Sequence, residues 1–146
     1  MTTSGTILCG VNGSRGARDA LQLARALSER LGLRLVVAHV ARDPERVAAG
    51  ERLLAEIADG AAGGGPPQVR LATGDRASRL AEIAGEEGAD LIIIGSPSGR
   101  RRRLGRRGAL ARELESATSC PVLIAPRQTR PRSEVRLARA QAVGTS

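Results

Sequence analysis

The chain has 146 residues, a formal net charge of +8 and no Phe, Tyr or Trp, which argues against single-strand nucleic-acid modules that stack bases on aromatic rings. Its length suits one ordinary domain that buries roughly two-thirds of its unfolded surface. No apolar run approaches the ~20 residues of a membrane span, and Met1–Gly5 lacks the basic start and apolar core of a signal peptide, so we expect a cytoplasmic protein without membrane contact.

Strand-like and helix-like segments alternate from the beginning of the chain. A strand is predicted at Thr6–Val11, and it ends at the turn Asn12-Gly13-Ser14, where Ser14 suits the N-cap of a helix. Alanine and leucine then recur at helical spacing as far as Leu31. The next strand, Leu33–Val40, is nearly continuous in apolar residues, which is typical of a parallel strand covered on both faces.

The same alternation continues through the middle of the chain. A helix is predicted from about Pro44 to Ala58, followed by a turn or short linker at Gly60–Pro67. A short strand at Gln68–Ala72 precedes a third helix, for which Asp75 is the expected N-cap rather than a catalytic residue. The fourth strand is predicted at Asp90–Ile94.

The segment after the fourth strand is the most informative one. It contains a glycine-rich and arginine-rich loop between Gly95 and Gly108, then a helix, then an apolar strand at Val122–Ala125. A strand that leads through a glycine-rich turn into a helix presents backbone N–H groups and a helix dipole to an anion. The pattern indicates a phosphate-bearing ligand.

Alternating strands and helices predict an α/β fold with a parallel sheet, right-handed crossovers and a doubly wound arrangement. Ligands of such sheets bind beyond the carboxyl ends of the strands, where the strand order reverses. We assign residues 1–126 to this domain. Residues 127–146 form a basic tail with five arginines against Glu134 alone, and we expect it to be mostly disordered.

Three short segments resemble the universal stress protein family. Val11-Asn12-Gly13-Ser14 is similar to the family's Val-Asp-Gly-Ser turn, Gly88-Ala89-Asp90-Leu91-Ile92 precedes the loop, and Cys120-Pro121-Val122 looks like the start of the family's fifth strand. The family's nucleotide loop reads Gly-x2-Gly-x9-Gly-(Ser/Thr). Gly95 and Gly108 match its first and third glycines, whereas Ser98 replaces the second glycine and Ala109 replaces the hydroxyl residue.

The resemblance implies a Rossmann-like sheet of five parallel strands in the order 3-2-1-4-5, with an adenine nucleotide between strands one and four. The implied ligand is ATP, with or without Mg²⁺. Backbone groups near Val40 would read the adenine edge. The implied binding residues are Val11, Asn12, Gly13, Val40, Gly95, Ser98, Gly99, Gly108, Ala109 and Leu110.

The departures from the family pattern leave alternatives open. Asn12 either contacts the nucleotide or only holds the turn after the first strand. Ser98 lacks glycine's freedom to approach a phosphate, and the neighbouring Gly99 takes over only if the loop shifts. The missing hydroxyl at Ala109 weakens binding by roughly tenfold to a hundredfold, given about 1.5–3 kcal/mol for a hydrogen bond to a charged group. The six arginines between Arg100 and Arg107 either compensate for that loss or are simply solvated.

The resemblance also bears on the cysteines and on assembly. The implied order separates Cys9 from Cys120 by two strand spacings, about 9.6 Å, which exceeds the ~7 Å limit for a disulfide. We expect two reduced thiols and no metal site. The family pairs its edge strand with a second copy, so a homodimer through the strand at 121–125 is implied.

No feature of the sequence favours an enzyme. The chain contains no lysine, so it has no Walker-type Gly-Lys-(Ser/Thr) motif, and its single histidine, His39, is expected to be structural. The leading hypothesis is a stress-response or signalling module that binds ATP. The alternatives are a dimeric interaction protein of the same fold that has lost the nucleotide, and a nonspecific binder of nucleic acid or another polyanion through its arginines.

Overall fold

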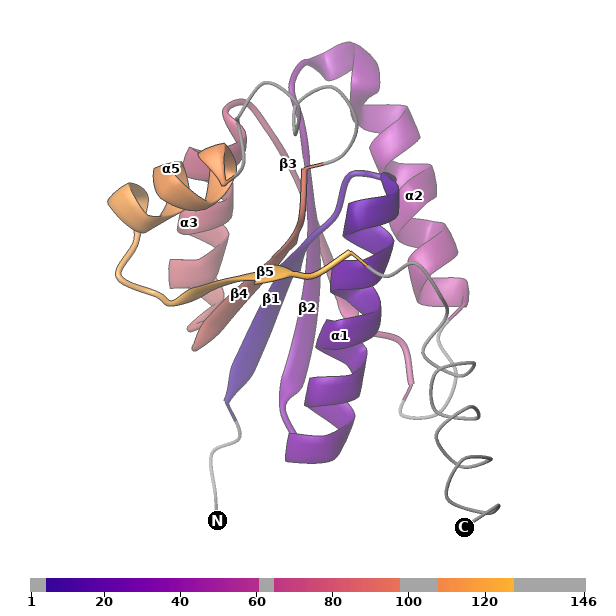
Figure 1. The fold of residues 1–146 in the computed structure, drawn as a ribbon. Coiled ribbons are helices and arrows are strands. Elements are labelled where there is room, and N and C mark those ends of the chain that lie inside the picture. Colours follow the sequence, from indigo (N-terminus) through magenta and orange to yellow (C-terminus); the bar gives the residue numbers. More distant parts are fainter. Residues whose placement is uncertain (1–4, 61–64, 98–107, 128–146) are drawn as a thin grey trace, which may run out of the picture.

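A computed structural model describes residues 5–60, 65–97 and 108–127 of the chain. They form a five-stranded, all-parallel sheet in the order β3-β2-β1-β4-β5, which confirms the predicted fold class and strand order (Figure 1). The strands are β1 (Thr6–Gly10), β2 (Arg34–Ala41), β3 (Gln68–Thr73), β4 (Leu91–Gly95) and β5 (Val122–Ala125). The helices are α1 (Arg15–Leu31), the 3₁₀ turn η1 (Pro44–Arg46), α2 (Val47–Asp59), α3 (Arg76–Glu87) and α5 (Ala109–Ala117).

Helices cover both faces of the sheet. Figure 1 shows α1 and α2 on one side and α3 and α5 on the other. Side chains alternate along each strand, so Ile7 and Cys9 of β1 pack with the α1 side while Leu8 packs with the α3 side. Both faces of the central strands are therefore buried, which explains why their sequences are continuously apolar.

Element boundaries differ slightly from the predicted ones. β1 ends at Gly10 rather than Val11, although the Val11 N–H still donates to the Ala38 carbonyl at 2.9 Å. The second and fourth strands each begin and end one residue later than predicted. The helix predicted from Pro44 begins as a 3₁₀ turn, because Pro44 fixes a first turn and neither Asp43 nor Arg46 caps the segment with its side chain.

The helix starts at the carboxyl end of the sheet are set by the predicted caps. Ser14 Oγ accepts from the Ala17 N–H at 3.2 Å, and Asp75 accepts from the Ser78 N–H at 3.0 Å. Each cap satisfies an N–H group that has no partner within its helix. Both expectations are confirmed.

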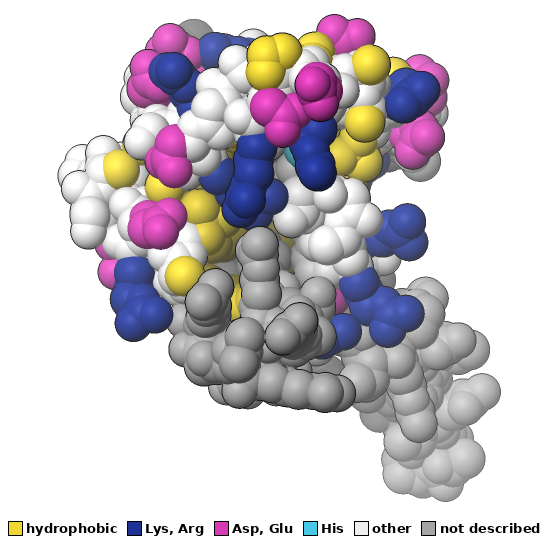
Figure 2. Space-filling model, turned by 90° about the horizontal axis from the view of Figure 1, so that it is seen from above, with side chains coloured by type: hydrophobic (Ala, Val, Ile, Leu, Met, Phe, Trp, Pro, Cys, Tyr) yellow, Lys and Arg dark blue, Asp and Glu magenta, His cyan; other side chains and the backbone are white. Residues whose placement is uncertain are grey.

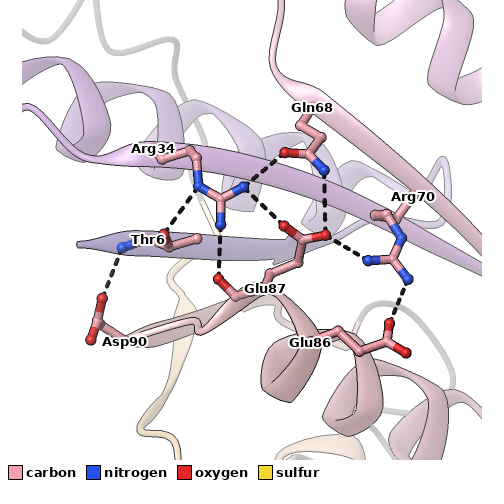
Figure 3. A network of polar contacts seen from close by, with 7 residues as sticks. All are labelled: Thr6, Arg34, Gln68, Arg70, Glu86, Glu87 and Asp90. Carbon is pink, nitrogen blue, oxygen red and sulfur yellow. Dashed lines mark hydrogen bonds and ion pairs between the residues drawn. The ribbon is translucent and has the colours of Figure 1, made fainter. Parts of the chain in front are cut away.

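The opposite end of the sheet is held by a network of charged side chains (Figure 3). Arg34 of β2 donates to Glu87 at 2.9 Å, and Arg70 of β3 donates to Glu87 and Glu86 at 2.6 Å each. Arg34 also donates to the Glu87 carbonyl at 2.8 Å. The Glu87 side chain is only 11% exposed, so it is the centre of the network that joins the edge strand β3 and its neighbour β2 to the end of α3.

We predict that this network makes stability depend on acid pH. Hydrogen bonds from Arg34 and Arg70 hold the pKa of Glu87 below its ordinary value of 4.5. A lowered folded-state pKa gives stability that is present above the unfolded value and lost as pH falls through the folded one. Urea unfolding from pH 7 to pH 2.5 is expected to show this loss, and Glu87→Gln lowers the free energy of unfolding at pH 7 while flattening its acid dependence.

The matched control for this experiment is Glu86→Gln. Glu86 makes a single ion pair in the network and its side chain is 59% exposed, so the change should have a much smaller effect. Equal effects of the two substitutions would contradict a network centred on Glu87.

Candidate functional site

A broad cleft lies at the carboxyl ends of the strands, where the strand order reverses between β1 and β4. Figure 2 looks onto this end of the molecule and shows basic side chains beside hydrophobic ones in the hollowed centre. Its walls come from six parts of the fold: the β1–α1 turn, the end of β2, one side of α2, the β3–α3 turn, the end of β4 and the start of α5. The predicted site residues on these walls are Val11, Asn12, Gly13, Val40, Gly95, Gly108, Ala109 and Leu110.

Two of the predicted residues, Ser98 and Gly99, lie outside the described residues, as do the arginines at 100–107. The tail at 128–146 also lies outside them. The described part of the cleft is therefore built without the centre of the glycine and arginine loop.

The β1–α1 turn is shaped by Asn12 and Gly13. Asn12 Oδ1 accepts from the Ser14 N–H at 3.0 Å, which is the turn-holding role that sequence reasoning left open. Gly13 has a φ of +80°, a left-handed conformation that favours glycine. Asn12 is exposed on the cleft, so its turn role leaves it next to any ligand there.

Gly95 has a packing role that the sequence did not reveal. A Cβ at Gly95 would collide with the backbone of Gly16 and would lie 2.7 Å from the Ala17 nitrogen. A Cβ at Gly16 would in turn collide with the Ser96 carbonyl oxygen. The first turn of α1 therefore lies directly against the end of β4. This close backbone approach is made to helix α1, so the assignment of Gly95 to a nucleotide stays a prediction.

The start of α5 lines the cleft with the backbone of its first turn. Gly108 is its N-cap with a φ of +72°, and no side chain caps the helix there. The N–H groups of Ala109 and Leu110 belong to the first turn, which has no intrahelical acceptors and carries about half a positive charge. An anion fits such a helix end, although Ala109 brings no hydroxyl to it.

The floor of the cleft is apolar and rigid. Val11 and Val40 are buried, and His39 Nδ1 hydrogen-bonds to the Val11 carbonyl at 2.8 Å. The His39 ring lies so close to Gly50 that a Cβ there would be 2.6 Å from the ring carbon Cδ2. His39 therefore joins the β1 end to β2 and α2, which is the structural role expected from its sequence.

Three arginines on the cleft were missed by sequence reasoning. Arg42 follows β2, Arg46 ends η1 and Arg76 begins α3. Three carboxylates also line the cleft: Asp43 lies 3.7 Å from Arg46, Asp75 caps α3, and Glu113 lies in α5. The signal in the sequence was that each arginine lies within six residues of the carboxyl end of a predicted strand, which is where ligands of parallel sheets bind.

The two cysteines are free thiols, as expected: Cys9 lies in β1 and Cys120 lies two residues before β5, with β4 between these two strands. Burial raises the pKa of the Cys9 thiol to about 12, and burial followed by the charge of Asp90 raises the pKa of Cys120. Both thiols are therefore neutral and poorly nucleophilic at pH 7. Within residues 5–60, 65–97 and 108–127, no group of three His, Cys, Asp or Glu side chains is arranged to hold a metal ion, and no helix is long and apolar enough to cross a membrane.

Comparison with known families decides the affiliation of the chain. The model of the universal stress protein family matches residues 3–126, which is most of the sequence and all five strands. The chain belongs to the universal stress protein family. No curated protein matches it significantly.

Solved structures of universal stress proteins share the fold. A family member from Burkholderia pseudomallei is 28% identical with a TM-score of 0.63, over 84% of this chain and 96% of that one. A universal stress protein solved in complex with cAMP is 24% identical with a TM-score of 0.67, over 87% of this chain and all of that one. The Archaeoglobus fulgidus universal stress protein solved in complex with dAMP is 18% identical with a TM-score of 0.63, over 86% of this chain and all of that one.

We predict that Gly95→Ala destabilises the fold, because the added methyl meets backbone atoms of α1 that cannot move aside. Overpacking of this kind costs about 1–3 kcal/mol. Gly85→Ala is the matched control, since Gly85 is an exposed residue of α3 with nothing within 4 Å of an added Cβ. Helix propensity should make that change neutral or stabilising by up to about 1 kcal/mol. Urea unfolding compares the two, and equal stability of both variants would contradict the packing argument.

Proposed function

We propose that this universal stress protein binds an adenine nucleotide, foremost ATP, in the cleft at the switch point, and that its bound state serves a stress-response or signalling role in the cytoplasm. The observation that carries the proposal is the convergence of the β1–α1 turn with the uncapped start of α5 beside an apolar floor. The family members solved with cAMP and dAMP support the ligand class.

In the proposed binding mode, the phosphates and the base of the nucleotide contact two different surfaces of the cleft. The phosphates lie at the first turn of α5, where the N–H groups of Ala109 and Leu110 and the helix dipole favour negative charge. The base lies on the apolar floor near Val40, and the ribose lies beside the turn at Asn12. In this binding mode, Mg²⁺ is bound by the phosphates of the nucleotide.

We also propose that the protein binds its nucleotide without turning it over. Phosphoryl transfer needs cationic and metal-binding groups placed around the transferred phosphate. A lysine-free chain supplies no Walker-type lysine for that purpose. The role we assign to the protein therefore depends on occupancy of the cleft.

A homodimer through β5 is the second part of the proposal. β5 is an edge of the sheet, and its apolar side chains Leu123 and Ile124 are 37% and 38% exposed. Exposed apolar edge strands tend to pair with another chain or to be covered. This surface also supports the alternative in which the protein acts mainly as an interaction module.

We predict that titration calorimetry with ATP at ~150 mM salt with Mg²⁺ detects binding that needs both adenine and phosphates. Micromolar affinity corresponds to about −8 kcal/mol. Adenosine and inorganic triphosphate, run separately, should each bind much more weakly. Gly108→Ala should weaken ATP binding about tenfold, because a side chain at positive φ strains the backbone by about 1–2 kcal/mol.

Gly32→Ala is the matched control for that variant. Gly32 has a φ of +68° and nothing within 4 Å of an added Cβ, but it lies at the far end of α1, away from the cleft. Binding of ATP no tighter than binding of bare triphosphate would contradict the proposal and favour a polyanion binder. Equal losses in the two glycine variants would contradict the assignment of the phosphates to the start of α5.

We predict that Leu123→Arg disrupts the dimer, giving a monomer or an insoluble protein, because a charge is placed on the exposed edge strand. Light scattering coupled to gel filtration measures the change. Val69→Arg is the control, since Val69 is 38% exposed on β3, the other edge of the sheet, and its substitution should leave the dimer intact. A soluble Leu123→Arg dimer of unchanged size would refute assembly through β5.

A further inference from the structure

Arg42 has an unusual position among the arginines of the described residues. It follows Ala41 directly at the carboxyl end of β2, where Val40 and Ala41 are 5% and 2% exposed. The Arg42 side chain itself is exposed and lies on the wall of the cleft. A buried strand end therefore carries a long, exposed cationic side chain at the cleft.

The surroundings of Arg42 leave its guanidinium available. Across the described residues it makes no hydrogen bond or ion pair, whereas Arg34, Arg70 and Arg79 are each held by glutamates. Its positive charge is one of the influences that lower the pKa of Asp75, after the hydrogen bonds from Ser78. Arg42, at the end of β2, and Asp75, in the β3–α3 turn, both line the cleft.

The amino-acid composition restricts what can cover a base in this cleft. The chain contains no Phe, Tyr or Trp, so no aromatic ring can stack on a purine. The nonpolar side chains on that end of the cleft, such as Leu53 and Leu80, are aliphatic. An arginine guanidinium is planar and weakly hydrated and stacks on π-faces, including those of nucleobases.

We propose that the guanidinium of Arg42 lies flat on the purine base of the bound nucleotide and supplies the stacking surface that an aromatic side chain provides in other base-binding proteins. This inference rests on the proposed nucleotide function, and it assigns Arg42 to the part of that site that binds the base. It makes Arg42 a residue that selects nucleotides over bare phosphates.

The topology favours contact with the base over contact with the phosphates. β2 is separated from β4 by β1, so the two strand ends lie about 9.6 Å apart at the usual strand spacing. The start of α5, which we assign to the phosphates, lies on the far side of β4, near Ile124 of β5. A nucleotide with its phosphates at α5 therefore extends its base toward Arg42.

The test compares Arg42→Lys, Arg42→Ala and the unaltered chain in binding to ATP and to ribose 5-triphosphate, which lacks the base. Lysine keeps the charge but loses the planar group. A cation over a ring contributes about 0.5–2 kcal/mol, so Arg42→Ala should weaken ATP binding roughly 2- to 30-fold. Arg42→Lys keeps the charge and loses only the planar stacking, so it should lose a smaller part of that affinity. Its affinity for ribose 5-triphosphate should stay within about twofold.

Arg52→Lys is the matched control, because Arg52 is exposed on α2 but does not line the cleft. It should change neither affinity, and thermal unfolding should show that all variants are folded. The expected result is a selective loss of the ATP preference in both Arg42 variants.

Two results would overturn the inference. If Arg42→Lys binds ATP as tightly as the unaltered chain, or if Arg42→Ala loses affinity equally for both ligands, Arg42 acts as a charge on phosphate and not as a stacking surface. The proposed function would survive either result. Absence of ATP binding by the unaltered chain would refute the proposed function and this inference together.

Discussion

The close packing of α1 against the end of β4 is the constraint on which the cleft depends. Gly16 and Gly95 meet there without side chains, so the first turn of α1 lies against the strand backbone. This contact fixes the β1–α1 turn at the switch point, next to the strand that leads toward Gly108 and α5. A side chain at either glycine would separate the two walls of the site. Fold stability and ligand geometry therefore depend on the same two residues.

The two ends of the sheet use charge in different ways. At the amino ends of the strands, arginines and glutamates pair with one another around Glu87, and the pairs hold the edge strand to α3 (Figure 3). At the carboxyl ends, Arg42, Arg46 and Arg76 line the cleft together with apolar residues, and Figure 2 shows basic side chains beside hydrophobic ones there. Charges that pair with each other stabilise the fold, whereas positive charge around a cleft raises the local concentration of anionic ligands. The arrangement agrees with a protein that presents one end of its sheet to a nucleotide.

The fold was predictable because its signals are local and repeated: continuous apolar strands, Ser14 and Asp75 as caps, and the strict alternation of strands and helices. The strand order came from resemblance to the family. The cleft arginines were not predicted, since Arg42 and Arg76 are 34 residues apart in number and meet only through the order of the strands. The packing at Gly95 was not predicted either. A glycine needed for close approach of a phosphate cannot be told apart in the sequence from a glycine needed for close packing of a helix.

The central claim is that the cleft at the switch point holds an adenine nucleotide between α5 and the end of β2. A titration of ¹⁵N-labelled protein with ATP, followed by two-dimensional NMR, tests it most directly, because each backbone amide reports separately. We expect the amide signals of Gly13, Ala41 and Ala109 to shift together with one dissociation constant, while those around Arg70 and Glu86 stay unchanged. Shifts confined to the Arg70 and Glu86 end of the sheet, or no shifts at saturating ATP, would contradict it.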